Sequence, residues 1–417
     1  MPLEYLGRKI GFLDDVIVEG KKVLLRLDIN SPIDPKTGAI LDDTRFQAHV
    51  ATIKDLLDRN ASIVMMSHQG RPTSDDFIRL DKHAQLLSRL LGRRVDYVPD
   101  VIGPEAVRRI DSLKPGDLLL LDNTRIISED YVEAEPEVHA RGIMVSTLSK
   151  HVDIYVNDAF ATAHRSQASI VGFPLALPGV AGRLMEKEIR VLSRIMSKDE
   201  RPKVFVLGGA KIKDTIKVIK HLVDAKVADE ILTTGLVSLL LLLVAGVRIG
   251  DAEKIIKKKV DEATVETARK LVARGAPIRT PLDFYSEIDE SIELVDVNNI
   301  VGAPKDIGPS TIEYYSWKMR NAKIIVMRGP AGVIEDPRFR RGTRKLVENA
   351  LKSKAYVVFG GGHFNSILNE IPEELKKRVG HISTGGGALL YFLSGRKLPG
   401  LESLAISYER YIAGAKG

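Results

Sequence analysis

The stretch ASIVMMSHQGRP, residues 61–72, joins an apolar run of strand length directly to a polar loop. A continuous apolar run bounded by polar residues is typical of a parallel strand that helices cover on both faces. In open parallel sheets, ligands bind beyond the carboxyl ends of the strands. The stretch therefore predicts an α/β fold, and it places His68 and Arg71 where an anionic ligand would bind.

The same alternation of apolar runs and helical patterns continues along the whole chain. In the first half we expect helices that include residues 43–59 and 138–149, and strands at 23–27, 63–66, 118–121 and 152–156. In the second half we expect strands at 204–207, 230–233, 324–327, 356–359 and 381–383. The pattern predicts two doubly wound parallel-sheet domains, Rossmann-like in layout, that face each other across a cleft.

Length and composition agree with two soluble globular domains. The chain has 417 residues, 44% of them hydrophobic and 28% charged, and it contains no cysteine. Disulfides and thiolate chemistry are therefore excluded, and we expect a cytoplasmic protein without a signal peptide. The apolar run at residues 236–245 is about half as long as a membrane span, so we interpret it as a buried helix.

The distribution of charge bears on binding partners, and proline and glycine positions bear on the domain boundaries. The formal net charge is +7, but the lysines are spread along the chain and the densest run, 257–259, fits a solvated helix face, so we expect no nucleic-acid partner. Proline and glycine at 174–179, a charged helix at 184–195 and the segment KDERP at 198–202 separate the halves. We expect domains at 1–182 and 201–400, joined by a linking helix and hinge at 183–200.

Basic side chains gather where the strands of the first half end. Arginine holds phosphate and carboxylate oxygens in bidentate geometry, so such a group predicts an anion site. Asp158 and Asp28 could instead be loop caps, and Arg125 alone could be a surface ion pair. The polar residues that follow these strands are Asp28, Asn30, His68, Arg71, Arg125, Asp158, His164 and Arg165, and Arg45 joins them from the start of a helix.

Glycine takes the corresponding positions in the second half. The loops GGAK (208–211), GPAG (329–332), GGGH (360–363) and GGG (385–387) follow predicted strands. Glycine lets backbone N–H groups approach a phosphate closely, and Lys211 would add a full charge. The sequence has neither GxGxxG with a following acid nor GxxxxGK[ST], so we exclude the common dehydrogenase and P-loop NTPase sites.

Eleven motifs, spread over nearly the whole chain, together resemble the phosphoglycerate kinase family in order and spacing. They are LRLDINSPID, TRFQAHVATI, SHQGRP, LDNTRI, VNDAFATAHRSQASIVGF, LGGAKIKD, PLDF, DIGPSTIEYY, RGPAGVIE, FGGGHFNSIL and HISTGGGALL. The resemblance implies reversible transfer of the γ-phosphoryl group of ATP to the carboxylate of 3-phosphoglycerate, giving 1,3-bisphosphoglycerate and ADP. It also implies Mg²⁺ as cofactor, a phosphoglycerate-binding first domain on which residues 401–417 pack, a nucleotide-binding second domain and a monomer.

The resemblance assigns roles to individual residues. Arg45, Lys211, Gly385 and Gly386 match positions at the transferring phosphoryl group. The positions that match phosphoglycerate contacts are Asp28, Asn30, Arg45, His68, Gln69, Gly70, Arg71, Arg125 and Arg165. Those that match nucleotide contacts are Gly209, Ala210, Lys211, Gly235, Pro330, Gly332, Val333, Glu335, Gly361, Gly362, His363 and Phe364. Asp214 is a candidate metal ligand.

Three positions depart from the bacterial and eukaryotic pattern of that family and resemble its archaeal members. Thr215 replaces a second lysine near the moving phosphate, so another cation has to stand in or the contact is lost, and Lys213 is one candidate. His363 replaces the aspartate associated with the metal ion. Arg328 replaces an asparagine, which changes the environment of the base or the phosphates.

Two other interpretations stay open at this point. Another two-domain kinase or nucleotide transferase acting on a small phosphorylated acid would share the site and differ in its substrate. A non-catalytic binding protein, for example one for nucleic acid, would show a steep salt dependence of affinity and no ATP turnover.

Overall fold

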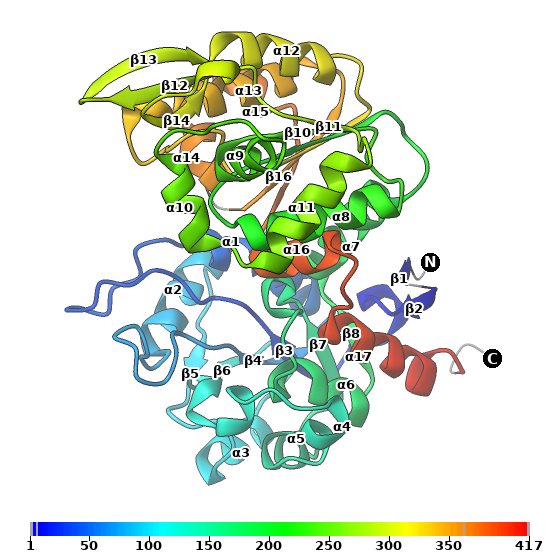
Figure 1. Ribbon diagram of the computed structural model, residues 1–417. Helices are drawn as coiled ribbons and strands as arrows, with labels where there is room; N and C mark the ends of the chain where they lie inside the picture. The colour runs from blue at the N-terminus through cyan, green and yellow to red at the C-terminus, as the bar shows by residue number, and fades with distance from the viewer. Residues whose placement is uncertain (1–2, 6, 362, 415–417) are drawn as a thin grey trace. The chain divides into compact units, whose positions relative to one another are not determined.

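The chain divides into two compact α/β units (Figure 1). The computed structural model describes residues 3–5, 7–361 and 363–414, without the side chains of Leu3, Glu4 and His363. Unit 1 runs to Arg190 and includes the segment from Lys397 onward, and unit 2 is Val191–Arg396. The predicted fold class is confirmed, because each unit contains a parallel sheet with helices between its strands.

Unit 1 contains a six-stranded parallel sheet in the order β5-β6-β4-β3-β7-β8. Its strands are β3 (Lys22–Arg26), β4 (Ser62–Met66), β5 (Asp96–Tyr97), β6 (Leu118–Leu120), β7 (Ile154–Asn157) and β8 (Gly179–Ala181), and a separate hairpin pairs β1 (Leu3–Tyr5) with β2 (Arg8–Ile10). Its helices are α1 (Thr44–Asp58), α2 (Asp81–Leu91), α3 (Pro104–Asp111), α4 (Pro136–Ala140), α5 (Ile143–Leu148), α6 (Phe173–Ala176) and α17 (Pro399–Ser407).

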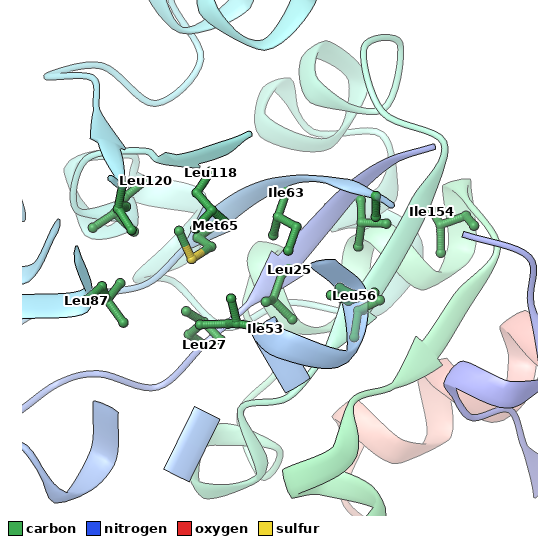
Figure 2. Packing of buried hydrophobic residues seen from close by; sticks show 14 of the residues in the cluster. Leu25, Leu27, Ile53, Leu56, Ile63, Met65, Leu87, Leu118, Leu120 and Ile154 are labelled. Carbon is green, nitrogen blue, oxygen red and sulfur yellow. The ribbon is translucent and has the colours of Figure 1, made fainter. Parts of the chain in front are cut away.

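The apolar runs read from the sequence form the core of unit 1 (Figure 2). Ile63 and Met65 of β4 pack beside Leu25 of β3, and α1 covers this face with Ile53 and Leu56. All five of these side chains are fully buried, and burying each stabilises the fold by roughly 1.5–3 kcal/mol. The sheet is therefore a rigid support for the loops that follow its strands.

One predicted helix of unit 1 is wrong in its extent. The sequence pattern predicts a single helix at 138–149, but the structure has two short helices, α4 and α5, separated at Arg141 and Gly142. The carboxylate of Glu129 accepts hydrogen bonds from the backbone of Ile143 (2.7 Å) and Met144 (2.9 Å), and it thereby caps α5 from outside the segment. Such a distant cap leaves no local signal in the sequence.

Unit 2 contains a second six-stranded parallel sheet, in the order β11-β10-β9-β15-β16-β17. These strands are β9 (Lys203–Leu207), β10 (Glu230–Thr233), β11 (Ile278–Arg279), β15 (Ile324–Arg328), β16 (Tyr356–Gly360) and β17 (Val379–Ser383). The helices are α8 (Ile212–Asp224), α9 (Gly235–Val244), α10 (Ala252–Lys259), α11 (Glu262–Ala273), α12 (Pro309–Met319), α13 (Arg341–Lys352), α14 (His363–Asn369), α15 (Glu373–Lys376) and α16 (Gly386–Leu393).

Unit 2 also has a small antiparallel sheet that the sequence pattern did not predict. It pairs β12 (Asp283–Ile288) with β13 (Ser291–Asp296) and β14 (Ala303–Ile307), and it lies at one end of the unit in Figure 1. β13 is mostly exposed, so its alternation of polar and apolar residues carries no clear core face. Strands of this kind give a weak sequence signal.

The most apolar segment of the chain is a buried helix, as expected. α9 buries Val237 and the run Leu239–Leu242 in unit 2. Among the described residues, no helix combines the length and the apolar character that crossing a bilayer requires.

Helix α7 (Arg183–Met196) contains the division between the two units, which falls after Arg190. At its first turn, the carboxylate of Asp158 accepts hydrogen bonds from the backbone of Leu184 (3.0 Å) and Met185 (3.3 Å). At its other end, the buried Lys203 donates from Nζ to the carbonyl of Ile195 at 2.9 Å. A carboxylate at the start of a helix and a cation at its end both complement the helix dipole.

Candidate functional site

The carboxyl ends of β3, β4, β6 and β7 bring most of the predicted polar residues of unit 1 to one edge of the sheet. β3 lies between β4 and β7, and the chain order reverses there, which is where open sheets bind ligands. Asp28 follows β3, His68 and Arg71 follow β4, Arg125 follows β6 and Arg165 lies beyond β7. We describe this edge first, and the edge of unit 2 separately.

Arg45 is held at this edge by an ion pair. It lies in the first turn of α1, its side chain is 41% exposed, and its Nη1 pairs with the buried carboxylate of Asp28. The backbone N–H of Asp28 donates to Nε2 of His49 at 3.1 Å, and Nδ1 of His49 lies 2.7 Å from Oδ2 of Asp158. Because Nε2 accepts, Nδ1 carries the proton and donates to Asp158.

Asp158 has a structural place at this edge. Its side chain is fully buried, and its two oxygens contact His49 and the first turn of α7. The loop-cap alternative raised by the sequence therefore describes Asp158 better than a ligand role does.

Asn30, Gln69 and Gly70 connect the loops after β3 and β4. Oδ1 of Asn30 accepts from the backbone of Gly70 at 2.9 Å, and the buried amide of Gln69 bonds both to the N–H and to the carbonyl of Ser31. Gly70 has φ +66°, and a Cβ there would lie 2.5 Å from the backbone of Asp76. Only glycine fits this position, and these three residues fix the loop that carries Arg71.

His68 is buried and neutral, so it is not a second cation beside Arg71. Burial lowers its pKa well below the usual value, and the nearby Arg26 and Arg125 lower it further. Nη2 of Arg26 lies 3.1 Å from Nδ1 of His68, and since a guanidinium only donates, Nδ1 is the acceptor. The proton of the neutral ring is then on Nε2, which is available as a donor to an anion.

The arginines at this edge of unit 1 are close enough for their charges to lower the pKa of Arg125 and of Arg165. Burial lowers the pKa of Arg125 to about 10, and the charges of Arg165, Arg26 and Arg71 contribute to this shift. Burial also lowers the pKa of Arg165, with Asp28 opposing and Arg71 reinforcing the effect. Mutual repulsion of buried cations is what a bound polyanion would relieve.

Arg26 is the functional candidate that the sequence analysis missed. It ends β3, it is fully buried, and it donates to Oγ of Ser169 at 2.8 Å as well as contacting His68. The signal in the sequence is an arginine within the otherwise apolar strand expected at 23–27. His164, half-buried, lies in the same loop as Arg165.

In unit 2 the carboxyl ends of β9, β10 and β15 meet through glycine turns. The backbone of Gly208 donates to the carbonyl of Arg328 at 2.8 Å, and that of Gly209 donates to Pro330 at 3.0 Å. Gly329 has φ +74°, and a Cβ there would lie 2.2 Å from the carbonyl oxygen of Gly208. The turns can therefore approach one another only because side chains are absent.

Two helices of unit 2 also begin with glycine, one after β10 and one after β17. Gly235 starts α9 and Gly386 starts α16, with Gly385 as the residue before the first turn. Helix starts carry unpaired N–H groups, and Lys211, exposed just before α8, adds a cation with Ala210 and Gly209 preceding it. The arrangement is a backbone cradle suited to phosphate.

The remaining predicted nucleotide positions differ in exposure. Val333 and Glu335 are exposed in the loop that follows β15, together with Pro330 and Gly332, which are half-buried. Gly361 follows β16, whereas Phe364 is a core residue whose ring lies 5.1 Å from that of Phe359, so only its backbone can serve a ligand. Gly362 and the side chain of His363 lie outside the described part of the chain.

Lys213, the candidate to stand in for the lysine that Thr215 replaces, points elsewhere. Nζ of Lys213 pairs with Asp261 at 2.9 Å, and Thr215 is buried with its hydroxyl donating to the carbonyl of Lys211 at 3.0 Å. Lys213 is therefore turned to a carboxylate on another helix of unit 2. The cation expected to stand in for the lysine is not Lys213 in this arrangement.

No protein cage for a metal ion is present in the part of the chain that the structure describes. Within it, no three His, Asp or Glu side chains gather as metal ligands, and Asp214 is a single half-buried carboxylate. Mg²⁺ in nucleotide sites is held by phosphates and waters with only one or two carboxylates, so this donor set fits a metal that arrives with the nucleotide.

Comparison with known proteins agrees with these features. A model of the family described as Phosphoglycerate kinase matches residues 13–396. The chain is 57% identical to the phosphoglycerate kinase of Aeropyrum pernix over 98% of both chains, and 49% identical to that of Sulfurisphaera tokodaii over 96% of both.

A solved structure gives the same result for the fold. The crystal structure of phosphoglycerate kinase from Pyrococcus horikoshii matches with a TM-score of 0.88 and 38% identity, over 96% of this chain and all of that one. The chain therefore belongs to the phosphoglycerate kinase family.

Proposed function

We propose that this chain transfers the γ-phosphoryl group of ATP to the carboxylate of 3-phosphoglycerate, reversibly, giving 1,3-bisphosphoglycerate and ADP. The observation that supports this choice of substrate is the group of mutually repelling arginines at the edge of unit 1. A small acid with a phosphate and a carboxylate supplies the negative charge that these side chains need. Family membership supports the same reaction.

Unit 1 supplies the acid-binding side. Residues 1–182, with 401–417 packed on them, form a phosphoglycerate-binding domain in this proposal. Arg71, Arg125 and Arg165 hold the phosphate, and neutral His68 donates one hydrogen bond, while Asp28, Asn30, Gln69 and Gly70 keep the loops in place. Arg45 stays near the carboxylate, since its half-exposed guanidinium can leave Asp28 for the transferring group.

Unit 2 supplies the nucleotide-binding side. Residues 201–400 form this domain, and residues 183–200 link it to the first. The backbone of Gly209, Gly235, Gly385 and Gly386 and the charge of Lys211 face the phosphates, and the loop with Val333 and Glu335 faces the nucleoside. Mg²⁺ carried by ATP would neutralise phosphate charge, with Asp214 as a candidate ligand.

The chemical step needs positioning more than acid–base catalysis. A carboxylate is already ionised at neutral pH, so no general base is required. One carboxylate oxygen bonds to the γ-phosphorus in line with the oxygen that bridges to the β-phosphate, that bridging bond breaks, and ADP takes the electron pair. Closure of the two domains would exclude water from the acyl phosphate.

A coupled assay tests the proposal. ATP consumption is measured with 3-phosphoglycerate, with other small phosphorylated acids, and with and without Mg²⁺. Turnover that requires both 3-phosphoglycerate and Mg²⁺ supports the proposal, and turnover with another acid alone moves the chain to a different substrate. Small-angle scattering tests closure, because both ligands together should compact the monomer more than either one does.

A further inference from the structure

Among the described residues, Nε of Arg328 is buried without a hydrogen-bond partner at the centre of the unit 2 sheet. Arg328 ends β15, and it lies in register with Leu207 of β9 and Gly360 of β16. The chain order reverses between β9 and β15, so Arg328 stands where a doubly wound sheet forms its ligand crevice. Its own carbonyl accepts from Gly208, which ties it to the glycine turns.

Burial of the guanidinium of Arg328 is energetically unfavourable in the absence of a ligand. Its Nε is buried without a hydrogen-bond partner, and its side chain forms no ion pair with the residues that the structure describes. Burial lowers its pKa to about 10, and Asp214 is the charge that opposes this shift. A guanidinium stays protonated at neutral pH, so a half-buried positive charge lies here without an ion pair, and Asp214 only partly offsets the cost of its burial.

Gly360 of β16 lies against this side chain. Gly360 has no side chain, and a Cβ there would lie 3.4 Å from Cγ of Arg328 and 2.5 Å from Leu389. Thr234, at the end of β10, likewise has a buried hydroxyl oxygen without a partner. These unsatisfied buried polar atoms lie at the carboxyl edge of one sheet, on β15 and just after β10 with β9 between them, and they point to a ligand that completes them.

We propose that Arg328 binds the phosphate chain of the nucleotide and supplies the positive charge that Lys213 and Thr215 do not supply. A planar guanidinium can hold two phosphate oxygens at once, and the nearby turns add backbone N–H groups. This inference rests on the proposed nucleotide site of unit 2.

The test compares Arg328→Met with Arg328→Lys and with Arg320→Met, an exposed arginine of the same unit. Three quantities are measured on the full chain: the melting temperature without ligand, the affinity for Mg·ADP and for adenosine, and kcat. We expect Arg328→Met to melt no lower than the wild type, since it removes a half-buried charge that has no ion-pair partner among the described residues. It should bind Mg·ADP about tenfold more weakly or worse, bind adenosine normally, and lose about 10²–10³ in kcat.

The controls separate a ligand role from a structural one. Arg328→Lys should recover part of the ADP affinity, and Arg320→Met should match the wild type. The inference is overturned if Arg328→Met binds Mg·ADP as the wild type does, or if ADP and adenosine weaken equally. A wild-type chain that binds ADP through Arg328 but does not phosphorylate 3-phosphoglycerate would refute the proposed reaction and leave this inference standing.

Discussion

The two sheet edges offer an anion different kinds of donor. At the edge of unit 1 the donors are side chains, and burial together with neighbouring arginines lowers the pKa of Arg125 and of Arg165. At the edge of unit 2 the donors are mostly backbone N–H groups of turns that require glycine. Guanidinium groups suit a compact acid with two charged ends, whereas amide turns follow an extended phosphate chain.

The largest expected effect comes from breaking the unit 1 side at Arg45. Replacing Arg45 by alanine removes a mobile guanidinium from the transferring group and should lower kcat by about 10³, by analogy with an arginine finger. Lys54→Ala removes an exposed charge from the same helix and serves as the control. An Arg45→Ala enzyme with near-normal turnover would contradict the role of Arg45.

Gly329→Ala breaks the unit 2 side. The new Cβ meets the carbonyl of Gly208 and forces φ +74° on alanine, so we expect a loss of about 3 kcal/mol in stability and about 10²-fold in turnover. Gly246→Ala has φ +90° but nothing within 4 Å, and it isolates the conformational cost. Equal losses in stability and activity for both variants would mean that close approach of the turns is unimportant.

Asp158→Ala sharpens the distinction between side chains that bind and side chains that support. It leaves His49 and the first turn of α7 without their buried partner, so the free energy of unfolding should fall by about 3 kcal/mol. Protein that remains folded should bind 3-phosphoglycerate within about twofold of the wild type, a factor worth well under 1.4 kcal/mol. Chemical denaturation and calorimetric titration measure the two quantities, with exposed Asp58→Ala as the control.

The last expected effect concerns the pH dependence of stability and the carboxyl group of Asp306 in β14. Burial raises the pKa of Asp306 to about 7 from 3.8, and its oxygens accept from the backbone of Gly342 and Ile307. The folded state therefore favours the protonated carboxyl, and this stabilisation is lost as pH rises from about 4 to about 7, by at most about 1.4 kcal/mol per pH unit.

Asp306→Asn should flatten that part of the stability profile. Denaturation midpoints are measured at several pH values for the wild type and for Asp306→Asn. A wild-type profile that gains stability over this range, with the same slope in the variant, would contradict the assignment to Asp306.

Several features could be predicted from the sequence because they follow local rules. The continuous apolar runs of β4 and β9 predicted parallel sheets. The polar residues and glycines that follow these runs predicted the sheet edge at which the arginines of unit 1 and the glycine turns of unit 2 lie. Features set by distant contacts could not be predicted. Glu129 breaks the helix expected at 138–149 from outside that segment, and the exposed β13 lacks a core face.

Side-chain environment was the other feature that the sequence did not show. The side chain of His68 is of a type that can carry a positive charge, but burial among arginines keeps it neutral. Arg26 was hidden at the end of an apolar strand, and Phe364 was grouped with the nucleotide loop although its ring belongs to the core. Residue type shows what a side chain can do, whereas burial and neighbours decide what it does.

The most direct test of the account is a crossed titration of both ligands against one variant of each edge. Calorimetry gives the affinities of Arg165→Met and Gly329→Ala for 3-phosphoglycerate and for Mg·ADP, each ligand alone. We predict that Arg165→Met loses about tenfold or more for 3-phosphoglycerate only, and that Gly329→Ala loses as much for Mg·ADP only. A variant that weakens both ligands equally, or weakens the opposite one, would contradict the division of labour between the two edges.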